Sequence, residues 1–479
     1  MRRRPPSGWS ARRDQDRVTS PWPTAKEMGD LVVRGPESGR VLLGRLQPGT
    51  GAASAVEWLS PGSGSPPLAA PPGYAVLVVG PARSGKTSTI LTPAVRRWQG
   101  PVIATSIRSD VLQGSWQERE AMGWPTLVYN PQNQGGYGSN TWSPLASVRG
   151  ERAWENARRV AAALIEASGS VEGGRNSEME FWNAAAADAL GPMLLAASRD
   201  GPSMQPVIRW LQAGDGAREE IRARLADQPA ALRAADAIWT GTERQRSSIY
   251  LTARTALAAY QDEAVLRTGV GSAPGRAPDI TPESVLDGPD GRGATLYVIS
   301  PPTDWRYFAP LFAALLMSVI DEVYRRADRG GRRGPAVLLA LDEVANIAPI
   351  RDLPSIASTA AGAGIQLITV LQDLGQAERI WGEAGTRTLI QNHYARLILG
   401  GTADVRTLEW AQAMLGETGV ETTTREQEGL LGKRRTSRRV DRRPVATPAE
   451  IRAMPRGTAL LISGSAPAAL VTLKPGTTI

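Results

Sequence analysis

Residues 80–87 are the sequence feature that most limits what this chain can fold into. They read Gly-Pro-Ala-Arg-Ser-Gly-Lys-Thr, which fits the phosphate-binding pattern of a glycine, four residues and then Gly-Lys-Ser/Thr. The apolar run 74–79 comes directly before them and predicts a strand that is buried on both faces of a parallel sheet. A helix is expected to follow. This order of strand, glycine-rich loop and helix predicts an α/β fold that binds a nucleotide.

Each residue type in this loop suits a particular part of phosphate binding. Glycines let the backbone curl so that its N–H groups face the phosphates, and the helix N-terminus adds partial positive charge. Lys86 is expected to reach the β- and γ-phosphates, and the Thr87 hydroxyl to bind Mg²⁺. Lys86 also stands out because only four of the 55 lysines and arginines are lysines. The predicted nucleotide contacts are Gly80, Pro81, Ala82, Arg83, Ser84, Gly85, Lys86, Thr87 and Ser88.

A second apolar run ends in two carboxylates. Residues 337–341 predict another buried strand, and Asp342 and Glu343 follow it directly. A nucleotide hydrolase needs one carboxylate to hold the metal ion and one to act as a base. The first role is assigned to Asp342, together with Thr87, and the second to Glu343.

A third apolar run, 365–371, ends in Gln372. Its amide is expected to lie beside Asp342 at the carboxyl edge of the sheet, where it can sense the γ-phosphate or orient water. A glutamine that merely caps a loop is the alternative. The predicted cofactors are ATP and Mg²⁺, the predicted metal ligands are Thr87 and Asp342, and the predicted catalytic residues are Lys86, Glu343 and Gln372.

Lys86 and Asp342 stand 256 residues apart, more chain than a compact nucleotide-binding core needs between adjacent strands. Apolar residues between 151 and 290 recur at helical spacing, as Ala157, Ala161 and Leu164 do, and this stretch contains no convincing strand pattern. The expected fold is therefore α/β, with a mostly parallel sheet that is interrupted by an inserted all-α domain.

The rest of the chain divides into segments of different composition. Residues 1–30 are polar and basic and are expected to form a disordered tail. Residues 31–73 are expected to hold short strands at 31–33 and 41–43, followed by a Ser/Pro/Gly linker from Gly62 to Gly73. The nucleotide-binding domain is then expected at 74–150 and 291–479, on either side of the inserted domain at 151–290.

The composition excludes several chemistries. The chain has no cysteine, so disulfides, cysteine-based zinc sites and cysteine nucleophiles are ruled out. The single histidine, His393, is interpreted as structural rather than catalytic.

The net charge of +8 points to an anionic partner, either nucleic acid or a membrane surface. Arginines gather in the first 17 residues, and seven cations gather between Lys433 and Arg443. The second cluster is expected to form a loop at the rim of the nucleotide domain. DNA, an anionic lipid surface and simple solvation are the three alternatives for it.

No targeting or membrane-spanning segment is expected. The N-terminal basic stretch is not followed by an apolar segment, so it does not fit a signal peptide. The longest apolar run, 307–320, is shorter than the roughly 20 residues that a helix needs to span a bilayer, and it predicts a buried helix.

Several short motifs occur in an order that resembles a known family. Beyond 80–87 they are 105–110, 140–145, 181–182, 341–343, 364–372, 391–393, 401–404 and 443–451. Taken together they resemble the conjugative coupling proteins of the TraG/TraD family, which belong with the FtsK/HerA motors. The resemblance covers roughly residues 74–472.

The resemblance implies a RecA-like P-loop NTPase domain interrupted by an all-α domain, with six copies forming a ring around a DNA channel. It implies an ATP-driven coupling protein that recruits and translocates single-stranded DNA with its attached relaxase. The implied partners are DNA, a relaxase or another relaxosome protein, and membrane secretion-channel subunits. The implied location is cytoplasmic, peripheral at the inner face of the cell membrane.

Two departures from the family pattern keep alternatives open. The family's transmembrane helices are not seen here. The stretch 360–364 also lacks the arginine that relatives often carry before the strand ending in glutamine. A double-stranded DNA pump of the FtsK/HerA kind and a recruitment adaptor that hydrolyses little ATP are the rivals. The candidates for the missing cation are Arg351, Arg387, Arg396 and Arg406.

Overall fold

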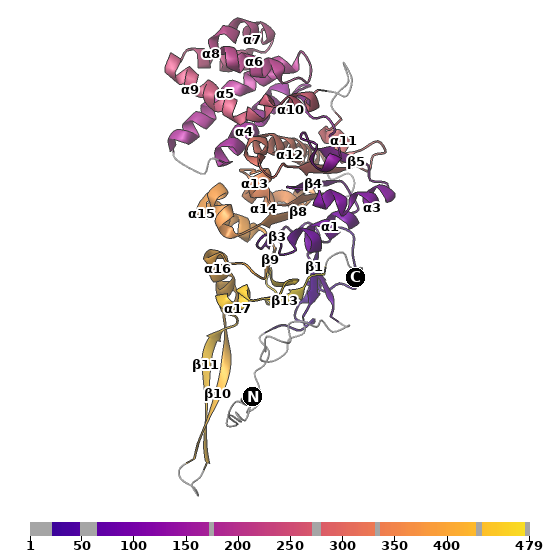
Figure 1. Cartoon of the computed structure of the whole chain (residues 1–479), viewed down its shortest axis with the longest axis vertical. Helices are drawn as coiled ribbons and strands as arrows, with labels where there is room; N and C mark the ends of the chain where they lie inside the picture. The colour runs from indigo at the N-terminus through magenta and orange to yellow at the C-terminus, as the bar shows by residue number, and fades with distance from the viewer. Residues whose placement is uncertain are drawn as a thin grey trace, which may run out of the picture.

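The computed structural model describes residues 22–47, 65–171, 177–270, 279–330, 336–427 and 434–474. One sheet of eleven strands forms the centre of the molecule (Figure 1), in the order β2-β1-β13-β12-β9-β3-β8-β7-β4-β6-β5. The strand bounds are β1 Leu42–Leu46, β2 Pro67–Ala69, β3 Val76–Val79, β4 Val102–Ser106, β5 Thr126–Tyr129, β6 Thr295–Ile299, β7 Val337–Leu341, β8 Ile365–Leu371, β9 Ala395–Leu399, β12 Thr458–Ser463 and β13 Ala469–Thr472.

The seven strands from β9 to β5 run parallel, and this part of the sheet confirms the predicted α/β class. Strand β3 lies in its interior, with Val76 opposite Ile368 on one side and Ala395 on the other. The remaining four strands extend the sheet with antiparallel pairs beyond β9. All four residues of β3 are buried, which is why its sequence is continuously apolar.

Helices cover both faces of the parallel strands. Successive side chains of β3 point to opposite faces, so that Val76 and Val78 belong to one core and Leu77 and Val79 to the other. The first core includes η3 (Thr87–Leu91), α1 (Thr92–Arg97), α2 (Asp110–Gln113) and, beside them, α3 (Trp116–Ala121). The second includes α12 (Trp305–Asp328), α13 (Val344–Ile347), α14 (Leu353–Ala363), α15 (Leu374–Asn392), α16 (Val405–Leu415) and α17 (Pro448–Arg452).

The described residues between β5 and β6 contain only helices. Helices α4 to α10 form a separate layer at one end of the molecule, where α4 packs on α5 and on α12, whereas α11 lies beside α12 and the sheet (Figure 1). The helices between β5 and β6 are η4 Gln134–Gly136, η5 Pro144–Ser147, α4 Ala153–Val171, α5 Ser177–Ser198, α6 Gln205–Ala213, η6 Gly214–Ala217, α7 Arg218–Arg224, α8 Pro229–Trp239, α9 Glu243–Ala256, η7 Ala258–Gln261, α10 Glu263–Thr268 and α11 Pro282–Leu286.

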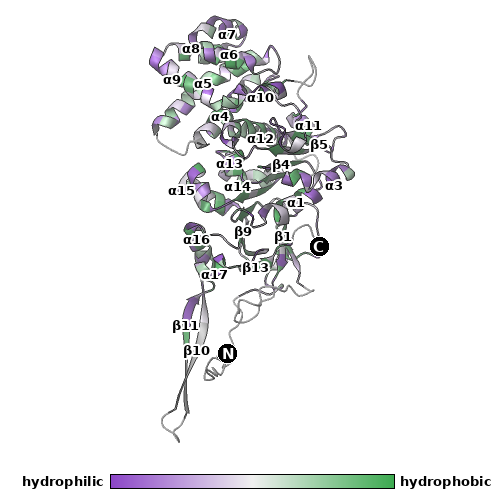
Figure 2. Cartoon of the chain, viewed as in Figure 1, coloured by the Kyte–Doolittle hydropathy of each residue, from purple (hydrophilic) through white to green (hydrophobic). Residues whose placement is uncertain are grey.

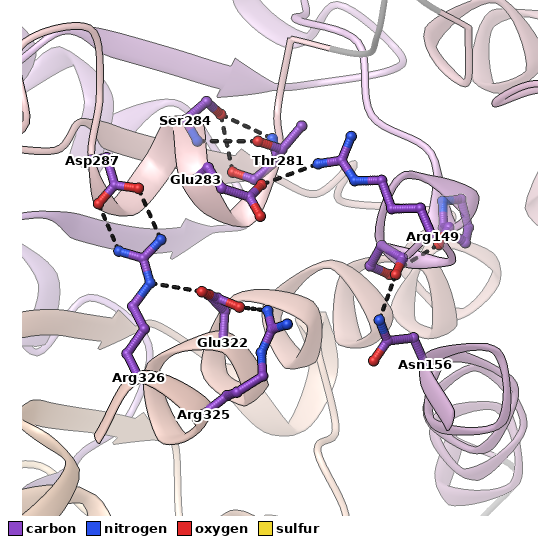
Figure 3. Close-up of polar contacts among 11 residues, drawn as sticks. Arg149, Asn156, Thr281, Glu283, Ser284, Asp287, Glu322, Arg325 and Arg326 are labelled. Atoms are coloured by element: carbon purple, nitrogen blue, oxygen red, sulfur yellow. Dashed lines mark hydrogen bonds and ion pairs between the residues drawn. The ribbon is translucent and has the colours of Figure 1, made fainter. Parts of the chain in front are cut away.

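A network of ion pairs lies where the chain leaves the sheet for this helical layer and returns from it (Figure 3). Arg326 of α12 donates to both carboxylate oxygens of Asp287, at 2.6 and 2.8 Å, and to Glu322 at 2.7 Å. Arg149, before α4, pairs with Glu283 of α11 at 3.3 Å. The Arg149–Glu283 pair joins the outgoing and returning connections, and Arg326 joins the returning connection to α12.

Helix α12 is longer than the predicted apolar run 307–320. It has 24 residues, and it is the one helix in the described ranges that is long and apolar enough to cross a membrane. Most of its apolar residues are buried between α4 and the sheet, among them Phe312, Leu315 and Leu316. The helix is therefore a core element of this fold, as Figure 2 shows by the hydrophobic colour shared by α12 and the neighbouring strands.

Residues 434–443 of the basic cluster belong to a strand, so the loop that was predicted for this part of the chain is wrong. Strand β11 (Arg434–Pro444) pairs antiparallel with β10 (Glu417–Gln427), from Glu417 opposite Pro444 to Gln427 opposite Arg434; Lys433 lies outside the described residues. This two-stranded arm projects away from the body at the end opposite the helical layer (Figure 1). A strand without an apolar face lacks the alternation on which a strand prediction rests.

The region before β3 is also more ordered than predicted. Residues 22–30 belong to the folded body, since Met28 is buried, and residues 1–21 lie outside the described part of the chain. The strand predicted at 31–33 is a short turn, η1 (Gly29–Leu31), followed by one bridge from Val32 to Leu68. Strand β2 lies inside the predicted linker and pairs with β1, which begins at Leu42.

Candidate active site

The loop between β3 and η3 is shaped by its glycines and by its neighbours. A Cβ atom on Gly80 would lie 2.8 Å from the Cβ of Leu399 and 2.9 Å from the Ser84 hydroxyl, so no larger residue fits there. Gly85 has a φ of +99°, which favours glycine. Arg83 adopts a left-handed φ of 64°, unusual for a residue with a side chain. The loop therefore curls tightly in front of the helix that begins at Thr87.

Lys86 is buried at the centre of this loop. Its ammonium donates to the carbonyl of Gly80 at 2.5 Å and to that of Pro81 at 3.0 Å. Burial lowers the pKa of Lys86 below its usual value, while the carboxylates of Asp342, Glu343 and Asp373 oppose that shift. A buried cation with flexible donors suits a phosphate group, which would satisfy them better than two carbonyls do.

Thr87 and Asp342 meet at the predicted metal position. The Thr87 hydroxyl donates to Asp342 Oδ2 at 2.7 Å, and the backbone carbonyl of Asp342 accepts from the Thr105 hydroxyl at 2.9 Å. Burial raises the pKa of Asp342 to about 6, against the opposing effects of the Thr87 hydroxyl and of Lys86. One carboxylate and one hydroxyl fit Mg²⁺, which commonly takes its other ligands from water and substrate phosphates.

Glu343 lies beside this pair and is held by two amides. Gln372 Nε2 donates to Glu343 Oε1 at 3.0 Å, and Asn346 Nδ2 donates to Glu343 Oε2 at 3.3 Å. Glu343 also has a left-handed φ of 45°, in the sharp turn between β7 and α13. Such a conformation is sparsely populated for a residue with a side chain and is typical of functional positions.

The sheet explains why these residues meet. Strands β3, β8 and β7 are parallel neighbours, so their carboxyl ends lie at one edge of the sheet. Lys86 and Thr87 follow the first of these strands, Gln372 follows the second, and Asp342 and Glu343 follow the third. The structure thus brings together all five side chains predicted for metal binding and catalysis. A buried hydroxyl without a hydrogen-bond partner, that of Ser84, lies within the same loop.

Sequence reasoning missed several residues at this edge. Thr105 and Asn346 hold Asp342 and Glu343, and Gln376 accepts from the backbone N–H of Gln372 at 3.0 Å. Position relative to the motifs could have indicated them, since Thr105 lies near the carboxyl end of β4 and Asn346 stands one helical turn after Glu343. The contact between Arg456 and the carbonyl of Arg83 had no signal in the sequence.

The four arginines considered for the missing cation are all engaged within this chain. Arg351 pairs with Glu166 at 3.4 Å, Arg387 with Glu383 at 3.0 Å, and Arg406 with Glu378. Arg396 donates to the carbonyls of Ile390 and Gln391 at 2.7 and 3.1 Å. None of these contacts reaches the residues of the site.

His393 is buried between the end of α15 and strand β8. Its two ring nitrogens lie 2.6 Å from the carbonyl oxygen of Leu389 and 2.8 Å from the hydroxyl of Thr369. A neutral imidazole donates to the first and accepts from the second, which uses both nitrogens. These contacts support a structural role.

Comparison with known proteins places the chain in a family. Residues 62–472 match the family described as Type IV secretory system Conjugative DNA transfer. The chain is 23% identical over 413 residues to the conjugal transfer protein TraG of Escherichia coli, covering 79% of this chain and 62% of that protein. It is 24% identical over 343 residues to VirD4 of Agrobacterium fabrum, covering 71% of this chain and 49% of that protein. The chain thus spans about half to three fifths of the length of these relatives.

Solved structures show the same fold. The bacterial conjugative coupling protein TrwBdeltaN70 aligns with a TM-score of 0.62 at 22% identity, covering 84% of this chain and 85% of that one. TrwB has also been solved in complex with a non-hydrolysable ATP analogue, and with ADP and Mg²⁺. The fold is thus the predicted RecA-like P-loop architecture with its helical insertion. Because the family match spans most of its length, this chain belongs to the conjugative DNA transfer proteins of the type IV secretory system.

Proposed function

We propose that this chain is a Mg²⁺-dependent ATPase that couples hydrolysis to the movement of single-stranded DNA with its attached relaxase. The observation that carries the proposal is the meeting of Thr87 with Asp342 and of Gln372 with Glu343, beside the buried Lys86. An ATPase needs a phosphate cradle, a metal ligand and a base at one point. This sheet edge supplies all three.

The chain's own residues divide the work. Lys86 and backbone N–H groups between Ala82 and Ser88 bind the phosphates, and the Lys86 ammonium offsets part of their charge. Thr87 and Asp342 would hold Mg²⁺, which supplies charge neutralisation at the β- and γ-phosphates when bound. Glu343 accepts the proton of the attacking water, because its carboxylate is fixed by two amide donors and faces the same edge. Gln372 orients Glu343 and the water.

Partners and location follow from the family and remain part of this proposal. The chain would act as a homo-hexameric ring, with DNA in its channel and a relaxase or another relaxosome protein as cargo. It would dock on membrane-embedded secretion-channel subunits at the cytoplasmic face of the cell membrane. The relatives named VirD4 and TraG, together with TrwB described as a coupling protein, support this assignment.

A second candidate is a recruitment adaptor that binds ATP and hydrolyses little. The absence of an arginine from the stretch 360–364 favours it, because a ring ATPase needs a cation that reaches the neighbouring site. A double-stranded DNA pump is the third candidate, and the same experiment separates all three.

The test is the rate of ATP hydrolysis by the full chain alone, with single-stranded DNA and with double-stranded DNA. We expect the largest stimulation by single strands. Lys86→Ala is the reference for lost catalysis, because it removes a charge-assisted phosphate contact while the loop keeps its backbone and glycines. It should keep the parent's thermal midpoint. Greater stimulation by duplex DNA would favour the pump. A parent rate as low as that of Lys86→Ala under all conditions would favour the adaptor.

A further inference from the structure

Arg456 contacts the phosphate-binding loop from the far end of the sequence. It lies in the turn between α17 and β12, and its guanidinium NH2 donates to the carbonyl of Arg83 at 2.5 Å. Arg83 stands in the middle of the four residues that separate Gly80 from Gly85, where loop N–H groups are expected to face the phosphates. A cation is therefore fixed at the rim of the candidate nucleotide site.

The backbone around Arg456 is held firmly against this loop. The N–H of Gly401 donates to the carbonyl of Arg452 at 3.0 Å, and that of Gly400 donates to the carbonyl of Thr458 at 3.3 Å. A Cβ atom on Gly400 would lie 2.2 Å from the carbonyl oxygen of Met454, so only glycine allows this approach. Gly401 lies in turn beside Pro81. Residues 400–401 therefore lie between the turn that carries Arg456 and the phosphate-binding loop, and they contact both.

The guanidinium keeps unused donor capacity. Its five N–H donors make one contact here, and Arg456 forms no ion pair with any residue in the described ranges. Its side chain is exposed at the mouth of the loop. This distinguishes it from the four arginines considered above, each of which already has a carboxylate or carbonyl partner away from the site.

The charge balance of the site calls for another cation. Three carboxylates, those of Asp342, Glu343 and Asp373, act on the single ammonium of Lys86. A bound nucleoside triphosphate adds several negative charges, of which Mg²⁺ offsets two. The charge that develops on the terminal phosphate during transfer is therefore poorly matched unless a further cation reaches it.

We propose that Arg456 supplies this cation from the same chain, turning from the Arg83 carbonyl to the terminal phosphate of bound ATP. The inference rests on the proposed ATPase function and assigns a catalytic contact within it. Arginines in this role are supplied either in cis or in trans in P-loop enzymes and raise kcat by about 10³- to 10⁵-fold. The short distance to Arg83 places this one in cis.

The first experiment compares Arg456→Gln and Arg456→Lys with the parent. The matched control is Arg452→Gln, an exposed arginine one turn earlier whose side chain makes no contact with the loop in the described structure. Affinities for a non-hydrolysable ATP analogue and for ADP are measured with Mg²⁺, together with hydrolysis and thermal midpoints. We expect Arg456→Gln to weaken the ATP analogue about tenfold more than ADP and to lower kcat at least about 100-fold, with an unchanged midpoint. Arg456→Lys should be intermediate, and Arg452→Gln should match the parent.

Other results would overturn the inference. Equal loss of affinity for both nucleotides with a lower midpoint would show that Arg456 only supports the loop. Unchanged affinities and kcat in Arg456→Gln would remove it from the site. A parent that binds no nucleotide would overturn the proposed function itself, which separates that failure from the failure of this assignment.

The second experiment tests the assignment in cis. Arg456→Gln and Lys86→Ala chains are mixed under assembly conditions, and ATP hydrolysis is measured against each alone. If Arg456 acted in trans, an intact Arg456 of one copy would complete the intact loop of its neighbour, and activity would return. We expect no recovery, since in cis every chain in the mixture lacks one of the two residues.

Discussion

The carboxyl edge of β3, β8 and β7 and the β10–β11 arm both concentrate charge, but they do so in opposite ways. At the sheet edge, the charged side chains of Lys86 and Asp342, which stand 256 residues apart in the sequence, are both buried, and the neutral Thr87 hydroxyl donates to Asp342. In the arm, six arginines follow one another along the single strand β11, and the described ones at its base, Arg442 and Arg443, are exposed. The first arrangement depends on the whole fold, and the second depends on eleven consecutive residues.

This difference determines how each region responds to change. Electrostatic interactions are strong in a buried site of low dielectric, so the loss of one group there has a large effect. Charges on an exposed strand are screened by salt, so each contributes little and only their sum matters. An isolated two-stranded hairpin is also marginally stable in water, so the arm contributes little to the stability of the body.

Of the variants that test this comparison, Glu343→Gln is expected to have the largest effect. The amide keeps the shape and the contact from Gln372, and Asn346 can rotate its amide to match the new donor. Removing the base should lower the hydrolysis rate by about 100-fold or more while Mg·ATP affinity stays close to that of the parent. Binding and single-turnover measurements check this. Glu383→Gln, an exposed change on α15, is the control, and hydrolysis equal to the parent's would remove Glu343 from its role.

A smaller effect is expected at His393. Burial lowers the pKa of His393 to about 4, and Arg396 adds to the shift. The unfolded chain, with a histidine pKa near 6.5, therefore binds a proton between pH 6.5 and 4 that the folded chain does not. Folding stability carried by this residue is present above about pH 6.5 and is lost as the pH falls, by up to about 2 kcal/mol at pH 5.

Thermal or denaturant unfolding of the parent and of His393→Gln at pH 7 and pH 5 measures this loss. The variant should be less stable at pH 7, because a buried hydrogen-bonded group is replaced, but it should lose less on acidification. Because His393 is the only histidine of the chain, the difference between the two pH dependences reports this residue alone. An equal loss in both proteins would contradict the assignment.

The smallest effect per residue is expected in the arm. Replacing Arg434, Arg435, Arg438 and Arg439 together with glutamine should leave the free energy of unfolding nearly unchanged. If the arm binds DNA, the slope of log affinity against log salt should become shallower by up to about 3 or 4. The neutral pair Thr422→Gln and Thr424→Gln on β10 is the control. An unchanged slope with weaker binding to anionic liposomes would instead make the arm a membrane contact, and no change in either would leave it a solvated ribbon.

The contrast between these regions also explains what the sequence could predict. The strands β3, β7 and β8 were predictable because each is an apolar run that ends in a residue of distinctive chemistry. The sequence predicts Gln372 beside Asp342 at the carboxyl edge of the sheet, because parallel strands align their carboxyl ends. Strand β11 was not predictable, because its arginines and Thr436 give no apolar face on which a strand pattern could be recognised.

The remaining misses have a common cause in long-range packing. Strand β2 begins with Pro67 and lies in a stretch that reads as a linker, and only pairing with β1 makes it a strand. Arg456 looks like an ordinary turn residue until the packing of 400–401 against 452–458 brings it to Arg83. Local patterns predict elements, whereas contacts across hundreds of residues depend on the assembled sheet.

The antiparallel half of the sheet has a consequence for how the protein is made. Strand β1, near the start of the described chain, pairs with β13, near its end, through Arg45 opposite Thr472. The phosphate-binding loop leaves the ribosome early, but its supports at Leu399, Met454 and Arg456 are synthesised last. Such non-local pairing is slow to form and must wait for the complete chain. A chain that ends before β9 would therefore carry the nucleotide motif but would lack Leu399 and Arg456, which contact the loop in the folded protein.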